Sequence, residues 1–246
     1  MKKYLSVFEM ITRSTLYKVL IVLVAMGAVQ MSMFWAELME TVDNVSDKTG
    51  IGMEMIVDKS HLDVPLAVGF VLVTILLCWS GCNIGSNQGY TLRRLQIGER
   101  AVFGLQILYN CFSYILLWAS QVAVTVGISC LYVQHASELT NQSIVLAYYK
   151  NSYMHSILPM EDSIGWLLII CLVLGCGVSS ATFPVHQRRG KIAYNTLIAI
   201  AMAIVSFPNR MDTEYSITVA CPFFAVIVLF AFAGVYGRMK EEQDDE

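Results

Sequence analysis

The sequence predicts an all-α integral membrane protein with six transmembrane helices and both termini in the cytoplasm. Three observations predict this class. Apolar residues make up 56% of the chain and charged residues only 14%, six apolar stretches are close to bilayer length, and basic and acidic segments alternate between them. A helix crosses the ~30 Å hydrocarbon core in about 20 residues and satisfies its own backbone hydrogen bonds there. The stretches lack the alternation of barrel strands, so we predict helices over residues 16–35, 64–84, 101–133, 163–183, 192–207 and 215–237.

The N-terminal residues 1–15 predict a short amphipathic helix that lies in the membrane interface. Tyr4, Leu5, Phe8 and Ile11 fall on one helical face, with the basic residues largely elsewhere. An irregular tail is the alternative. A cleaved signal peptide fits this start poorly, because the apolar run begins late and has no small-residue cleavage site after it.

The loop that follows the second predicted span, residues 85–100, is the most distinctive polar segment. It reads GSNQGYTLRRLQIGER. Leu92 and Leu95 give a short helix an apolar side, and Arg93 and Arg94 give it a charged one. We predict a short cytoplasmic helix placed to touch a partner. The alternative is an ordinary basic loop whose arginines only fix topology.

The third predicted span is longer than a bilayer requires. Its 33 residues would measure ~50 Å as one helix, so it must project from the membrane, tilt or break. Polar side chains within one arc of its surface suggest a wall of a hydrated pathway, and the alternative is hydrogen bonding between helices, worth ~0.6–2 kcal/mol. The candidate pathway residues are Gln106, Asn110, Ser113 and Gln121, with Ser120 beside them.

The last three predicted spans carry small residues and prolines at informative positions. The fourth ends in GCGVSSA (residues 175–181), in which small residues recur every fourth position and predict close helix contact. The fifth is short and ends near Pro208. Pro222 predicts a kink or break in the sixth. The acidic tail, residues 238–246, is predicted to be a solvated end.

The distribution of charged residues between the two sides of the membrane predicts the orientation of the chain. The segments that would share the face of the termini hold 12 of the 16 basic residues, and the opposite face holds 12 of the 19 acids. Because Lys and Arg are retained on the cytoplasmic side during insertion, both termini are predicted to be cytoplasmic. The two long outer loops, residues 36–63 and 134–162, are then acidic. All seven cysteines fall within predicted spans, so no external disulfide framework is expected.

Several classes of chemistry lack their usual residues. The sequence has no G-x-x-x-x-G-K-[ST] phosphate loop. All four histidines fall in predicted loops, and no predicted span centre contains a titratable Asp, Glu, His, Lys or Arg. Embedded hydrolases and proton-coupled carriers need such groups at membrane depth. We therefore predict a protein that is not an enzyme and holds neither a metal nor a cofactor.

On these features the chain resembles the permease subunit of bacterial type-2 ABC exporters, in the small six-span form that includes the lantibiotic and bacitracin self-protection permeases. An interfacial helix precedes the first span, and six spans stand without a nucleotide-binding domain. The segment GYTLRRLQIGERAVFGLQ (residues 89–106) is similar to the family pattern of a Gly, a short run with basic residues and Leu, and an Arg before the third span.

The resemblance implies a coupling helix seated on a separate cytoplasmic ABC ATPase subunit that binds the ATP. It also implies a second permease copy, identical or different, and export of a lipid-like molecule, peptide or antibiotic across the plasma membrane, as in antibiotic resistance. Nucleic acid is not an expected partner. The alternative is a non-transporting scaffold, sensor or immunity protein whose acidic outer loops bind a cationic peptide. The implied ATPase-coupling residues are Tyr90, Leu92, Arg93, Arg94, Leu95, Glu99 and Arg100.

Overall fold

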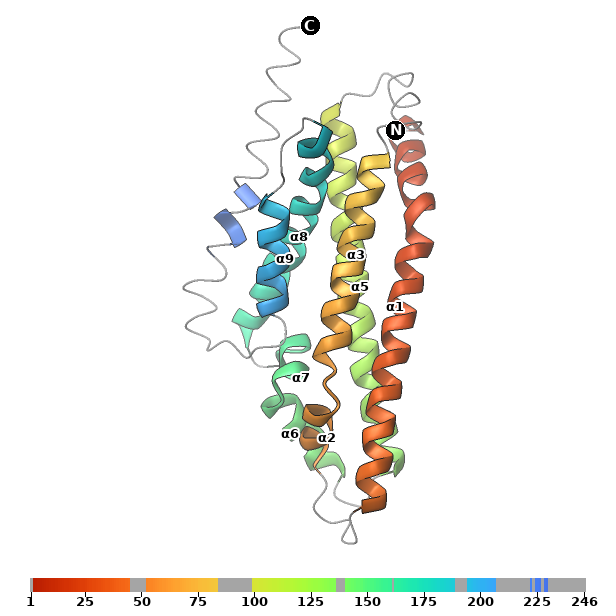
Figure 1. Ribbon diagram of the computed structural model, residues 1–246. Coiled ribbons are helices and arrows are strands. Elements are labelled where there is room, and N and C mark those ends of the chain that lie inside the picture. The colour runs from red at the N-terminus through yellow and green to blue at the C-terminus, as the bar shows by residue number, and fades with distance from the viewer. Residues whose placement is uncertain are drawn as a thin grey trace, which may run out of the picture.

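A computed structural model describes residues 2–44, 52–83, 99–135, 140–160, 162–188 and 194–206, together with residues 222, 224–226 and 228–229. Within these residues the regular structure is entirely α-helical and contains no strand (Figure 1), which confirms the all-α class. The helices are α1 (Lys2–Asn44), α2 (Met53–Lys59), α3 (Asp63–Asn83), α5 (Glu99–His135), α6 (Thr140–Lys150), α7 (Ser152–Ile157), α8 (Ser163–Arg188) and α9 (Tyr194–Ser206).

Three of the described helices are long and apolar enough to cross a membrane. Their spanning parts are Thr15–Val42, Ala101–His135 and Ser163–Gln187. A fourth span is available if Met53–Lys59 and Asp63–Trp79, which meet at a 55° bend, count as one. The chain is therefore a membrane-embedded helical protein. The predicted sixth span and the kink at Pro222 lie largely outside the described residues.

Helix α1 differs from the prediction at both ends. It runs without interruption from Lys2 to Asn44, so residues 2–15 continue into the first span and do not form a separate interfacial helix. The segment contains neither Gly nor Pro before Gly27, and nothing else in its sequence forces a break. At its other end the spanning part reaches Val42, well beyond the predicted limit at residue 35.

Helices α1 and α5 lie side by side and run in the same direction (Figure 1). Thr15 pairs with Tyr109 in the first half of each helix, and Trp35 packs edge-on against His135 in the second half of each. Between these points, a Cβ added at Gly27 would lie 3.2 Å from Val124 Cγ2, so the helices stay adjacent there. The long third stretch is thus one unbroken 37-residue helix, supported along its length by α1.

The opposite side of α5 packs on α8 through small residues. A Cβ added at Gly177 would lie 3.2 Å from both the Cα and the N of Cys111, so the two backbones approach closely. Two residues earlier in α8, a Cβ at Gly175 would lie 2.9 Å from the buried ring of Phe224. These contacts confirm that the small residues of the fourth stretch serve close packing. Helix α8 continues through Pro184 to Arg188, five residues beyond the predicted limit.

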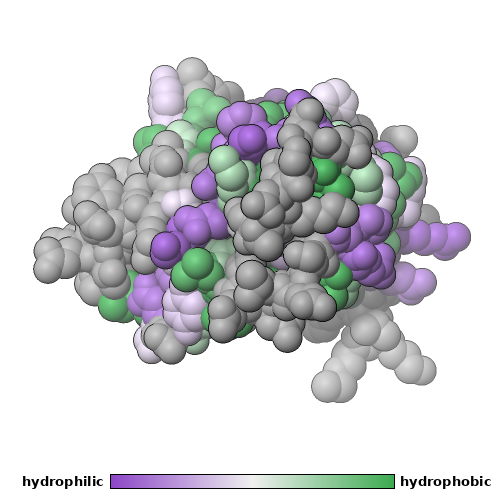
Figure 2. Space-filling view, turned by 90° about the horizontal axis from the view of Figure 1, so that it is seen from below, coloured by the Kyte–Doolittle hydropathy of each residue, from purple (hydrophilic) through white to green (hydrophobic). Residues whose placement is uncertain are grey.

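The segments predicted as outer loops contain helices. α2, α6 and α7 gather at the end of the bundle opposite the beginning of α1 (Figure 1). We call this the cap end, and we call the end where α1 and α5 begin and α8 finishes the basic end. Basic residues of α1 and α8 lie toward the basic end, whereas acidic residues gather at the cap end, and Figure 2 shows hydrophilic side chains on that face. The acids of the cap end include Glu37, Glu40, Glu54, Asp58, Asp63 and Asp162.

Candidate functional site: two buried polar clusters

The four candidate pathway residues all lie on the buried face of α5. Asn110, Ser113 and Gln121 are at most 1% exposed, and Gln106 is 4% exposed. They do not form one continuous polar stripe, because buried Leu117 lies between Ser113 and Gln121. The polar side chains instead divide into a cluster toward the basic end and a cluster toward the cap end.

The basic-end cluster ties α5 to α8 through an amide. Asn110 Nδ2 donates a hydrogen bond of 2.9 Å to Ser180 Oγ, and Ser180 Oγ in turn lies 3.1 Å from the carbonyl of Gly177, to which it can donate. Ser113 Oγ donates within its own helix, to the carbonyl of Tyr109. This is the geometry that the interhelical hydrogen-bonding alternative requires of Asn110.

Two tyrosines extend this cluster to the neighbouring helices. Tyr109 OH lies 2.6 Å from Thr15 Oγ1 of α1, and Tyr114 OH lies 2.9 Å from Thr74 Oγ1 of α3. Sequence reasoning missed both tyrosines because it counted them as part of an apolar stretch. A tyrosine hydroxyl that is buried in an apolar stretch usually has a hydrogen-bond partner, and this is the signal that could have identified them.

The carbonyl and the hydroxyl group of Ser179 in α8 differ in their hydrogen bonding. Its carbonyl accepts from Thr182 at 2.8 Å and from Thr196 of α9 at 3.0 Å. Its own hydroxyl oxygen is the one buried side-chain polar atom of the described chain without a hydrogen-bond partner. Thr196 thereby links α9 to α8 at the basic-end cluster.

The cap-end cluster joins α1, α5 and α7 through two amides and a phenol. Gln30 and Gln121 pair reciprocally, with Nε2 to Oε1 distances of 3.0 and 3.1 Å. Tyr153 OH donates to Gln121 Oε1 at 2.9 Å and lies 3.0 Å from Gln30 Nε2. Gln30 Nε2 also lies 3.1 Å from the carbonyl of Leu62, in the turn between α2 and α3. The Gln121 amide further approaches Met26 Sδ at 3.6 Å.

The cap-end cluster contains no charged side chain, and its phenol stays protonated near neutral pH. Burial raises the pKa of Tyr153 above its ordinary value, the nearby Asp63 carboxylate raises it further, and only the hydrogen bond with Gln30 opposes the shift. The cluster can therefore hold and release hydrogen bonds, but it offers no group that exchanges a proton at physiological pH.

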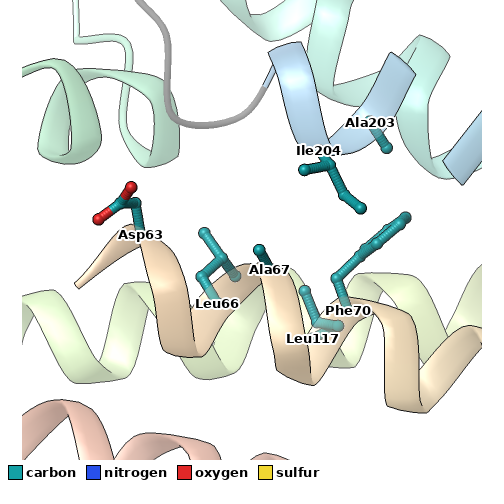
Figure 3. A pocket seen from close by; sticks show the side chains of 7 residues that line it. All are labelled: Asp63, Leu66, Ala67, Phe70, Leu117, Ala203 and Ile204. Atoms are coloured by element: carbon teal, nitrogen blue, oxygen red, sulfur yellow. The ribbon is translucent and has the colours of Figure 1, made fainter. Parts of the chain in front are cut away.

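Two adjoining apolar hollows lie between α3, α5, α8 and α9. They have about 300 and 330 Å³ of empty space, including space open to the surroundings, and they share Phe70, Leu117 and Ala203. Figure 3 shows the first, with Leu66 and Phe70 of α3 facing Ile204 of α9 and Asp63 at one end. Their linings are otherwise apolar or aromatic.

The predicted coupling residues are placed only in part. Tyr90, Leu92, Arg93, Arg94 and Leu95 lie outside the described residues, and Glu99 and Arg100 form the first turn of α5. Among the residues that the structure describes, no group of three His, Cys, Asp or Glu side chains could hold a metal ion. No disulfide is formed by Cys78, Cys111, Cys130, Cys171 or Cys176.

Comparison with known proteins adds no relative. No protein-family model matches the chain, and neither the curated proteins nor the solved structures contain a significant match.

Proposed function

We propose that the chain is the membrane-spanning permease subunit of an ATP-driven exporter of a lipid-like molecule, peptide or antibiotic. The proposal rests on one observation: the end of α3, the beginning of α5 and the basic residues lie at the same end of the bundle. α3 ends at Asn83 and α5 begins at Glu99 at the basic end (Figure 1), so the 85–100 segment, with Arg93 and Arg94, is attached there. A cytoplasmic ATPase has to act at such a position.

The span interiors support an energy source outside the chain. Between Lys18 and Glu37 of α1, and from residue 101 to residue 134 of α5, the sequence holds no charged side chain. The polar groups buried there are neutral amides, hydroxyls and phenols. Ion-coupled carriers place ionisable groups at this depth, whereas a permease driven by a partner ATPase does not need them.

The proposal includes topology and assembly. The basic end faces the cytoplasm by the positive-inside rule, which places both termini of a six-span chain on that side of the plasma membrane. Two permease copies, identical or different, form the complex with the ATPase subunits. ATP binds the partner, so this chain needs no cofactor.

Co-purification tests the proposal. A tagged chain extracted in mild detergent should carry a subunit with a Walker motif. R93E/R94E should lose that subunit while the chain still inserts, because the charge reversal removes cationic contacts at the basic end. K150E at the exposed end of α6, at the cap end, is the matched charge-reversal control and should retain the subunit. Repeated purification of the wild-type chain without a nucleotide-binding partner would overturn the proposal.

A second candidate function rests on the acids of the cap end. Glu40 and Asp58 are exposed there, and Glu37 is partly exposed, so the chain would serve as a sensor or immunity protein that binds a cationic peptide. Binding of an amphipathic Lys-rich peptide to the purified chain, weakening steeply with salt and needing no ATPase, favours this function. Equal binding to E40Q/D58N argues against it.

A further inference from the structure

Helix α7 is held in place by its neighbours rather than by its own sequence. It has six residues, and an isolated helix of that length is not stable in water. Tyr153, Met154 and Ile157 point inward and are at most 6% exposed. Figure 1 shows the helix at the cap end, near the beginning of α3.

Both ends of α7 are fastened to other elements. At its beginning, Asn151 Oδ1 accepts from the Met154 backbone N–H at 3.0 Å, and Asn151 Nδ2 donates to Asp58 of α2 at 2.6 Å. At its end, Trp118 Nε1 of α5 donates to the carbonyl of Ile157 at 3.0 Å. Between these points Tyr153 reaches the cap-end cluster.

The chemistry of the cap-end cluster suits a contact that opens and closes. Gln30 Nε2 has two amide protons, and three acceptor oxygens lie within 3.1 Å of it. The closed cluster therefore offers this amide more acceptors than it has protons to donate. If α7 moves away, water can satisfy Gln30 and Gln121 in place of Tyr153. Opening also exposes the inward faces of Met154 and Ile157 to water, and their burial favours the closed position. The phenol between two amides adds only a modest further cost to release, because water can replace its hydrogen bonds.

We propose that α7 is a re-entrant plug that closes the cap end of the bundle, and that the cluster of Gln30, Gln121 and Tyr153 is its lock. The consequence for transport rests on the proposed function, in which the plug is the outer gate. The closure itself does not depend on an ATPase, so a test of solvent access separates the failure of this inference from the failure of the proposed function.

Two reporter cysteines on α5 distinguish local opening from unfolding. Thr125 is fully buried one turn nearer the cap end than Gln121, and Ser113 is fully buried two turns nearer the basic end. T125C and S113C are made separately in a variant whose seven native cysteines are replaced. Each is labelled in right-side-out vesicles with a membrane-impermeant maleimide.

The lock is weakened by Y153F, and Y148F is its matched control. Tyr148 of α6 also lies at the cap end, and its hydroxyl lies 3.3 Å from Ser129 Oγ of α5, but it has no bond to the cap-end cluster. Because Y153F removes both hydrogen bonds of the hydroxyl, the one it donates to Gln121 and the one it accepts from Gln30, we expect T125C to label roughly 5- to 150-fold faster in this background. S113C should stay unreactive, and Y148F should leave both rates within about twofold.

Each remaining outcome counts against the plug. Unchanged labelling of T125C in Y153F means that the cluster does not control access. Equal acceleration of T125C and S113C means that the change unfolds the bundle and does not release one helix. If Y153F yields no folded protein, W118F, which removes the bond to Ile157 and reduces the ring that packs against Trp166, gives the same test with the same two reporters and the same criteria.

Discussion

The contact between Gly177 and Cys111 predicts a measurable cost for a single methyl group. G177A places a Cβ 3.2 Å from the Cα and the N of Cys111 and against its Sγ. The backbone atoms cannot rotate away, so α5 and α8 must separate by a few tenths of an ångström. Overpacking of this kind costs about 1–3 kcal/mol. Alanine also favours the helix over glycine by roughly 0.5–1 kcal/mol, which offsets part of the loss.

G104A on α5 is the matched control that removes the propensity term. A Cβ at Gly104 meets no atom within 4 Å, so this variant gains helix propensity without steric cost. The difference between the two variants therefore isolates the clash at about 1–3 kcal/mol, or roughly 2–12 °C in unfolding temperature for a chain of this size. Thermal unfolding in detergent, followed by size-exclusion profile, measures it. If G177A unfolds at the same temperature as G104A, the close approach of α5 and α8 is wrong.

Three further results are expected. S180A leaves Asn110 Nδ2 without its partner and should lower the free energy of unfolding by about 0.6–2 kcal/mol, as measured by denaturation in mixed micelles. N151A removes the cap of α7 and the bond to Asp58, and should cost about 0.5–2 kcal/mol and speed amide hydrogen exchange in residues 152–157. Because the raised pKa of Tyr153 favours the neutral phenol in the folded state, its contribution is fully present below about pH 10 and is lost as the pH rises further. The unfolding temperature of wild type relative to Y153F should thus be constant from pH 7 to 9 and fall toward pH 11, and a flat difference up to pH 11 would contradict the burial of this phenol.

Much of the helical arrangement could be predicted because long apolar stretches in a membrane have few alternatives to a helix. The predicted third stretch became α5 with two residues added at each end, and the second and fifth became α3 and α9 within two residues at each limit. The limits of α1 and α8 were less accurate. Hydropathy marks where a chain enters lipid, but a helix with no Gly or Pro to stop it continues past that boundary, as α1 does toward Lys2 and Asn44.

The polar clusters could be predicted only in part. Asn110 and Gln121 were singled out because amides are unusual in an apolar stretch, and the structure buries both. Gln30 carried the same signal within the first stretch and was passed over. Tyr153 could not be identified, because its role depends on α7 folding back against the bundle, and its sequence resembles that of an exposed loop.

Composition and the order of apolar and charged segments were enough to determine a membrane-embedded helical chain with a basic and an acidic end, since burial of backbone in lipid and retention of cations act on sequence alone. The folded packing decided which polar groups meet. Gln121 and Tyr153 follow Gln30 by 91 and 123 residues along the chain, and no local pattern encodes that convergence. Only the fit of α1, α5 and α7 brings two amides and a phenol within 3 Å, because the position of each depends on contacts made by the whole of its helix.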